Sequence, residues 1–169
     1  MKMKTFRINP GLLLGALLSL TCIMTACDDD DDDDTTVIPG NEIVALKEVA
    51  LTGAEEVPAV TTQATGTFKG TYNMDTKVMN YTITFQGITP TAMHFHKGGV
   101  GVPGPVTIPI NPGTSNDPYS STNPFNSPII RSTPPLTAAQ EAELLGGEWY
   151  VNIHSAQFPD GEIRGQITR

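Results

Sequence analysis

The sequence predicts an all-β fold, either an antiparallel β-sandwich or a partly open barrel, with one short helix. Several short runs alternate between apolar and polar residues, and one segment alone has the start and stop signals of a helix. The composition agrees, because 16 Gly and 14 Pro in 169 residues favour turns and short strands over long helices. We therefore expect short strands that turn one face toward a core.

Residues 65–85 predict a β-hairpin. In TGTFKGTY the even-numbered residues from Gly66 to Tyr72 share one face, and Thr and Lys occupy the other. In KVMNYTITF the odd-numbered residues from Met79 to Phe85 form the apolar set, and NMDT supplies the turn between the two runs. One buried face and one solvated face are typical of an antiparallel sheet.

The middle of the chain predicts two more strands and a long loop. TAMHFH (91–96) is the third strand and PVTIPI (105–110) the fourth, and the prolines of PVTIPI place it at a sheet edge. Residues 111–135 are rich in Pro, Ser and Asn, and they predict a loop.

The last third predicts the helix and the closing strands. In LTAAQEAELLGG, Thr137 is the expected N-cap, Gln140 completes a capping box, and Gly146 suits a left-handed C-terminal position. EWYVNIH (148–154) and GEIRGQIT (161–168) are the expected closing strands, joined through the turn residues FPDG.

The N-terminal residues predict export rather than fold. Residues 1–26 have a basic start, a short apolar run and the ending MTA before Cys27, which resembles the lipobox of bacterial lipoproteins. Cys27 is then the lipidated residue, residues 27–41 form a flexible tether with the acidic tract Asp28–Asp34, and residues 42–169 form the β domain. A secretory peptide without lipidation is the alternative.

The predicted location is the cell envelope, with the lipid anchored in the outer membrane. An acidic run directly after a lipidated cysteine resembles the surface-export signal of some Gram-negative lipoproteins, so both the periplasmic and the external side remain open. The net charge of −8 excludes nucleic acid as a partner, since binding a phosphate backbone requires a basic surface. Signal cleavage would remove Cys22 and lipid would occupy Cys27, which leaves no disulfide and no thiolate ligand.

The chain has three histidines, His94, His96 and His154, and all lie in predicted strands. Side chains alternate across a strand, so the apolar Met93 and Phe95 take the core face and leave both neighbouring histidines on the other. The same parity in WYVNIH places His154 on the non-core side. The strand order, which decides whether the three rings meet, is not encoded in these patterns.

If the rings meet, three imidazoles can bind one metal ion and leave a position open to water. Imidazole ligands suit copper, zinc or nickel better than calcium or magnesium, so copper or zinc is the expected cofactor, if any. Glu162 is a candidate acceptor for the outward N–H of a metal-bound ring, whereas Arg164 disfavours a metal unless it recruits an anion. A polar sheet face without metal and a pH-sensitive histidine cluster are the alternatives.

Five stretches together resemble the CHRD domain, a module named after the growth-factor antagonist chordin and also found in bacterial secreted proteins and lipoproteins. They are LTGAEEVPAV, GTFKGTY with YTITFQGI, AMHFHKGGVGVPGPV, LTAAQEAELLGGEWYVNIHS and PDGEIRGQI. The resemblance implies an immunoglobulin-like β fold and a general role in extracellular binding.

A more distant likeness is to Cu,Zn superoxide dismutase, which also carries His-x-His on one strand and a further copper-binding histidine on a later one. His94, His96 and His154 match three of its copper ligands, but the bridging histidine, the zinc loop and the disulfide have no counterpart in this chain. We therefore expect a non-catalytic extracytoplasmic binding module. The alternatives are a three-histidine copper or zinc domain, with minor redox activity as its enzymatic form, and a structural envelope protein.

Overall fold

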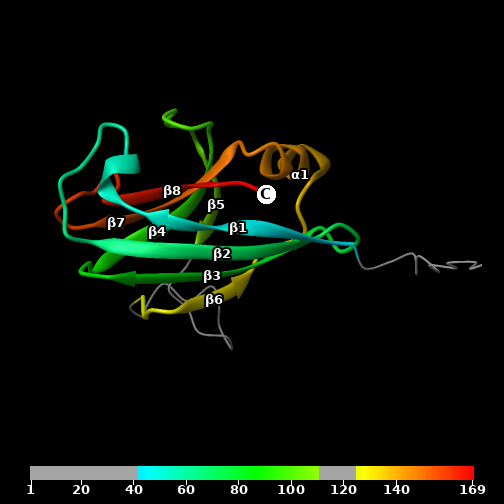
Figure 1. Ribbon diagram of the computed structural model, residues 1–169, viewed down its shortest axis with the longest axis horizontal. Coiled ribbons are helices and arrows are strands. Elements are labelled where there is room, and N and C mark those ends of the chain that lie inside the picture. Colours follow the sequence, from blue (N-terminus) through cyan, green and yellow to red (C-terminus); the bar gives the residue numbers. More distant parts are fainter. Residues whose placement is uncertain (1–41, 111–124) are drawn as a thin grey trace, which may run out of the picture. The chain divides into compact units, whose positions relative to one another are not determined.

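Eight strands in two antiparallel sheets make up the fold of residues 42–110 and 125–169, the part of the chain that this computed structural model describes (Figure 1). The predicted signal peptide, Cys27 and the acidic tether lie outside these residues. The elements are β1 Ile43–Leu51, the 3-10 helix η1 Gly53–Glu55, β2 Thr65–Asn73, β3 Val78–Gln86, β4 Pro90–Lys97, β5 Val106–Ile110, β6 Ile129–Ser132, α1 Ala138–Leu145, β7 Trp149–Ser155 and β8 Ile163–Ile167.

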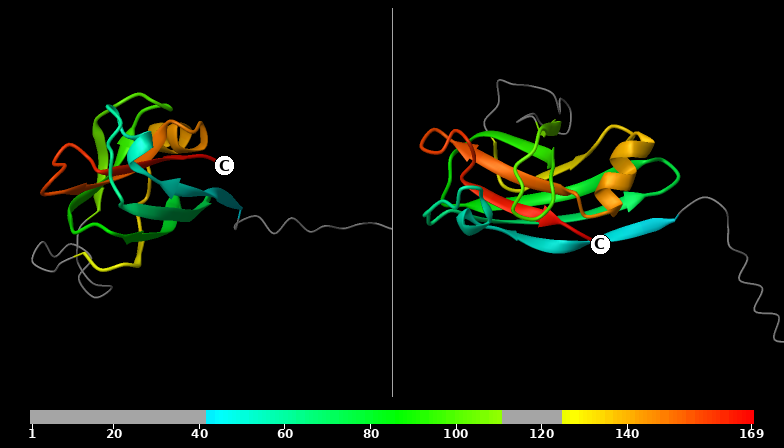
Figure 2. Two further views of the ribbon diagram at one scale, coloured as in Figure 1. Left: turned by 60° about the vertical axis from the view of Figure 1, so that its left-hand side comes forward. Right: turned by 90° about the horizontal axis from the view of Figure 1, so that it is seen from above.

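The sheets have the strand orders β1-β2-β3-β6 and β5-β4-β7-β8, so the predicted all-β sandwich is confirmed. They adjoin along one side, where β1 and β8 run next to each other (Figure 2). There Thr52 and Arg164 exchange two backbone hydrogen bonds of 3.0 Å each. Because β5 and β6 remain the outer strands of their sheets, the described residues form a sandwich joined at one side rather than a closed barrel.

The predicted hairpin is β2 and β3, which pair from Thr65↔Gln86 to Asn73↔Val78. Their apolar faces point into the sandwich as expected, and Phe68, Tyr72 and Ile83 are fully buried. Together with the inner faces of β4, β7 and β8 they form one hydrophobic core. This core fixes which face of each strand is left for polar groups.

The sequence predicted the edge strand β5 but not the edge strand β6. PVTIPI is β5 at the edge of its sheet, as its prolines indicate. The predicted loop 111–135 was wrong in part, because β6 lies within it and pairs antiparallel with β3. Ile129 is buried opposite Ile83, whereas Ile130 is exposed. A four-residue strand is too short for its alternation to stand out in the sequence.

The helix α1 begins as predicted and ends slightly differently. Thr137 accepts from the Gln140 backbone, and the Gln140 side chain accepts in return from the Thr137 backbone, which completes the capping box. The expectation for Gly146 was wrong: its φ is −77°, and the left-handed residue is Gly147, at φ 74°. None of the helices within the described ranges has the length and apolar character needed to span a membrane.

Candidate metal centre

The outer face of the β5-β4-β7-β8 sheet carries the three histidines. Parity along β4 is as predicted, since Met93 and Phe95 are fully buried in the core and the two histidines project from the opposite side. No sequence pattern indicated that this opposite side is covered as well. His96 is only 8% exposed and His154 7%, because loops fold back over the sheet.

The strand register brings the histidines together. β4 and β7 are neighbours, with His94 directly opposite Asn152 and with Ala92 opposite His154. His154 is therefore the diagonal neighbour of His94, and His96 is two residues further along the same face of β4. The pairing of β4 with β5 shifts between Phe95 and His96, an irregularity of the kind often found beside functional sites.

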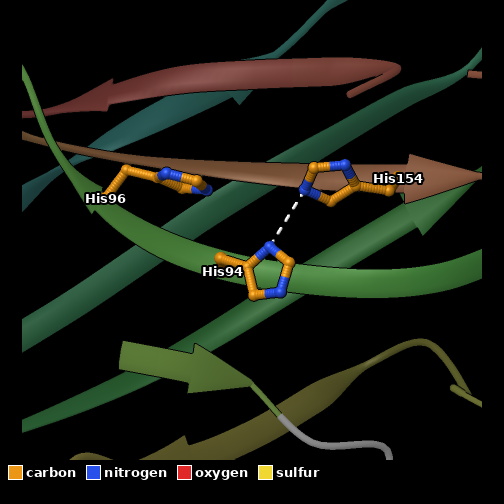
Figure 3. Close-up of side chains that lie close together, drawn as sticks. All are labelled: His94, His96 and His154. Carbon is orange, nitrogen blue, oxygen red and sulfur yellow. Dashed lines mark hydrogen bonds between the residues drawn. The ribbon is translucent and has the colours of Figure 1, made fainter. Parts of the chain in front are cut away.

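The three rings converge on one point (Figure 3). One nitrogen from each lies within 4.8 Å of the others, and His94 Nδ1 is 3.0 Å from His154 Nε2. Bonds of about 2.0–2.1 Å to a tetrahedral ion place two nitrogens about 3.3 Å apart. The first pair is already close to this spacing, and the third nitrogen needs to move by no more than about 1.5 Å.

Backbone carbonyls fix the proton on two of the rings. His96 Nδ1 lies 2.9 Å from Gly104 O, and His154 Nδ1 lies 2.9 Å from Pro159 O. A carbonyl oxygen only accepts, so Nδ1 must carry the hydrogen in both rings. Each Nε2 then carries a lone pair that points into the cluster. Histidines that bind a metal through Nε2 have the same arrangement.

The environment of His96 Nε2 is the strongest indication that the site binds a ligand. This nitrogen is buried and makes no hydrogen bond within normal distance and angle, although the Asn152 side chain faces the ring. A buried polar atom without a partner costs about 1–3 kcal/mol. The ring cannot turn away easily, because it stacks on Tyr150 at a centroid distance of 4.8 Å and an angle of 6°. A metal ion would supply the missing partner.

Arg164 holds the loop that covers the site. Its Nη2 donates to Gly99 O at 3.1 Å and to Val102 O at 3.0 Å, and its guanidinium lies 3.4 Å above the centre of the Tyr150 ring. Gly104 closes the same loop, because a Cβ there would overlap the carbonyl of Lys97. These contacts place the Gly104 carbonyl beside His96.

Burial keeps the imidazoles neutral. Desolvation, followed by the neighbouring histidines, lowers the pKa of His94 to about 4. Desolvation also lowers the pKa values of His96 and His154, while the hydrogen bonds to Gly104 and Pro159 oppose the shift. Neutral imidazole is the form that binds metal.

Glu162 and Arg164, the two polar residues that the sequence singled out beside the histidines, each contact another protein group. Glu162 accepts a 2.6 Å hydrogen bond from Thr62 Oγ1, and Arg164 binds loop carbonyls. The carboxyl group next to the cluster is instead Glu56, whose pKa is raised to about 7 by desolvation, with Arg164 and Asn152 opposing. AEEVP contained no signal for this, because the alternation that marks strand faces does not extend into the loop after η1.

In the metal-free protein, the contributions of the histidines and of Glu56 to stability change with pH in opposite directions. The histidine pKa values are depressed, so their contribution is present above about pH 6.5 and is lost as the pH falls. The pKa of Glu56 is raised, so its contribution is present below 4.5 and is lost as the pH rises toward 7. Acidification from pH 7 to pH 5 therefore weakens the first contribution and restores the second.

We expect the Glu56→Gln variant to lose more stability than the wild type between pH 7 and pH 5. The variant lacks the compensating gain, which is about 1–2 kcal/mol after allowance for solvent screening. Urea unfolding with a chelator present, at both pH values, measures the difference. An equal loss in the two proteins would contradict the buried position of this carboxyl group.

Comparison with protein-family models matches residues 48–167 to the family described as the CHRD domain. The match covers more than half of the chain and includes every strand and helix described above except the first residues of β1. No curated protein and no solved structure matched the chain. The likeness to Cu,Zn superoxide dismutase therefore stays a prediction.

Proposed function

Because the chain belongs to the CHRD domain family, we propose that it is an extracytoplasmic binding module whose ligand is a single copper or zinc ion held by His94, His96 and His154. The observation that carries the proposal is the unpartnered, buried Nε2 of His96 beside the imidazoles of His94 and His154. A polar sheet face without metal would be expected to satisfy this atom with a protein donor.

The donor set favours transition metals. All three ligands are neutral imidazole nitrogens, which suit copper and zinc, and they add no negative charge of the kind that calcium requires. The acidic tract Asp28–Asp34 is a separate polyanion that attracts cations weakly, and an experiment must distinguish it from the folded site.

We propose binding without catalysis, and attachment to the outer membrane through a lipid on Cys27. The residue next to His154 supports the first part. Ser155 Oγ accepts from Phe158 N at 3.2 Å, and adjacent residues of a strand point to opposite faces, so Ser155 and His154 do not form a nucleophile–base pair. The lipobox-like MTAC sequence supports the second. Mass analysis of the protein purified from its native membrane tests the anchor.

Metal titration of the purified, untagged chain tests the proposed ligand. We expect one zinc ion per chain by calorimetry, and one cupric ion with nitrogen hyperfine structure in its electron paramagnetic resonance spectrum. A variant with His94, His96 and His154 all changed to alanine should lose this binding and keep only the weak uptake of the Asp tract. Zinc and copper uptake that is equal in the two proteins would overturn the proposal.

A further inference from the structure

Asn152 lies at the centre of the histidine cluster and belongs to the same sheet face. It is directly opposite His94 on β4, and it precedes His154 by two residues on β7. Its Oδ1 is 3.0 Å from His154 Nε2, and its side chain also faces His96. Asn152 is 3% exposed, so its side chain is almost completely buried.

In the metal-free protein, the two atoms that face each other in this contact, Asn152 Oδ1 and His154 Nε2, are both hydrogen-bond acceptors. His154 donates through Nδ1 to Pro159 O, which leaves a lone pair on Nε2. Asn152 Oδ1 is an acceptor too, so the two atoms repel unless a proton or a cation lies between them. Turning the amide by 180° would remove the repulsion, because Nδ2 would then donate to the ring.

Glu56 opposes that turn. The Glu56 carboxyl group and Asn152 Nδ2 meet at Gly161, where a Cβ would stand 2.5 Å from Glu56 Oε1 and 2.9 Å from Asn152 Nδ2. Glu56 Oε1 is buried and has no hydrogen-bond partner, so a turn of the amide would bring two unpaired acceptors, Oε1 and Oδ1, near each other. Gly161 has a φ of 135°, so a side chain is excluded there by both conformation and space.

We propose that Asn152 Oδ1 is the fourth acceptor of the metal site and that Glu56 is the positioning residue that holds this oxygen toward the ion. The inference rests on the proposed function and extends it from three ligands to four. Two imidazole lone pairs are fixed by backbone carbonyls, and the Glu56 carboxyl group lies at the Nδ2 end of the amide. Repulsion among these acceptors is relieved when a cation binds.

A double-mutant cycle in zinc affinity separates orientation from charge. With Asn152 present, the Glu56→Gln variant should bind zinc about 10-fold more weakly, because the substituted carboxamide can pair with either orientation of the Asn152 amide. Asn152→Ala alone should weaken binding about 10- to 100-fold. When Glu56→Gln is added to Asn152→Ala, it should have only the small effect of removing a nearby negative charge. The cycle therefore reports the orienting contribution alone.

The amide itself provides a second measurement that needs no variant of Asn152. In ¹H–¹⁵N spectra of the metal-free protein, the Nδ2 protons of Asn152 should exchange slowly with solvent in the wild type and faster in the Glu56→Gln variant. A role of Glu56 in general stability would instead speed the exchange of backbone amides throughout β7. Urea unfolding of each variant records that contribution independently.

The outcomes distinguish the inference from the proposed function. Zinc binding by the wild type, with equal losses from Glu56→Gln whether or not Asn152→Ala is also present, would overturn the positioning role and leave the three-histidine site intact. Zinc affinity unchanged by Asn152→Ala would remove the fourth acceptor. Absence of zinc and copper binding in the wild type would overturn the site and the inference together.

Discussion

The His94→Ala variant is expected to lose zinc affinity by at least about 100-fold while the metal-free protein keeps its stability within about 1 kcal/mol. His94 is the half-buried member of the cluster, and its ring contacts His154 rather than a backbone carbonyl. Removing it deletes a ligand without breaking a loop contact. Calorimetric zinc titration and urea unfolding with a chelator measure the two quantities.

Thr91→Ala is the matched control, because Thr91 is an exposed residue on the same strand. It should change neither quantity. If His94→Ala bound zinc as tightly as the wild type, His94 would not be a ligand. If the variant lost several kcal/mol of stability without metal, the cluster would be a structural feature of the sheet face.

The faces of the strands could be predicted from the sequence because alternation is a local property. Met93 and Phe95 define the inner side of β4, and the histidines between and beside them must point the other way. The same argument placed His154 correctly on β7. Such parity requires no knowledge of which strands are neighbours, and this explains why the candidate ligands were found.

The meeting of the rings could not be predicted, because it depends on the pairing of β4 with β7 across more than fifty residues of chain. The loop that covers the site could not be predicted either. It depends on Gly104 folding back onto Lys97 and on Arg164 reaching the carbonyls of Gly99 and Val102. Contacts between loops and a sheet face leave no periodic pattern in the sequence.

The polar side chains on the outer face of the β5-β4-β7-β8 sheet are covered by loops, and this distinguishes the site from an ordinary outer sheet face. Arg164, Tyr150 and His96 follow one another across β8, β7 and β4, with the guanidinium above the tyrosine ring and the tyrosine stacked on the imidazole. A buried cation next to the site opposes metal binding by charge repulsion, and the effect of Arg164 on metal affinity stays a prediction. Its contacts with two carbonyls and an aromatic face reduce that opposition.

The Phe95→Ala variant is expected to lose about 3–5 kcal/mol of stability, the largest effect of a single core truncation that we predict. Phe95 is fully buried and contacts Tyr81 edge-on at a centroid distance of 4.9 Å and Phe68 at 6.1 Å. It also stacks with Trp149 of β7 at 6.1 Å. Urea unfolding of the metal-free variant measures the loss.

The same substitution tests how far the core fixes the metal site, because Phe95 lies between His94 and His96 on β4. A cavity beneath the strand should let the two rings move apart, so we expect zinc affinity to fall about 10-fold. At a fixed excess of zinc this reduces the stabilisation by metal by about 1.4 kcal/mol. Phe95→Leu, which keeps most of the volume, should cost less than about 1.5 kcal/mol and leave the affinity unchanged. If Phe95→Ala lost stability as predicted but gained the full wild-type stabilisation from zinc, the loops and the backbone of β4 would hold the site without help from the core.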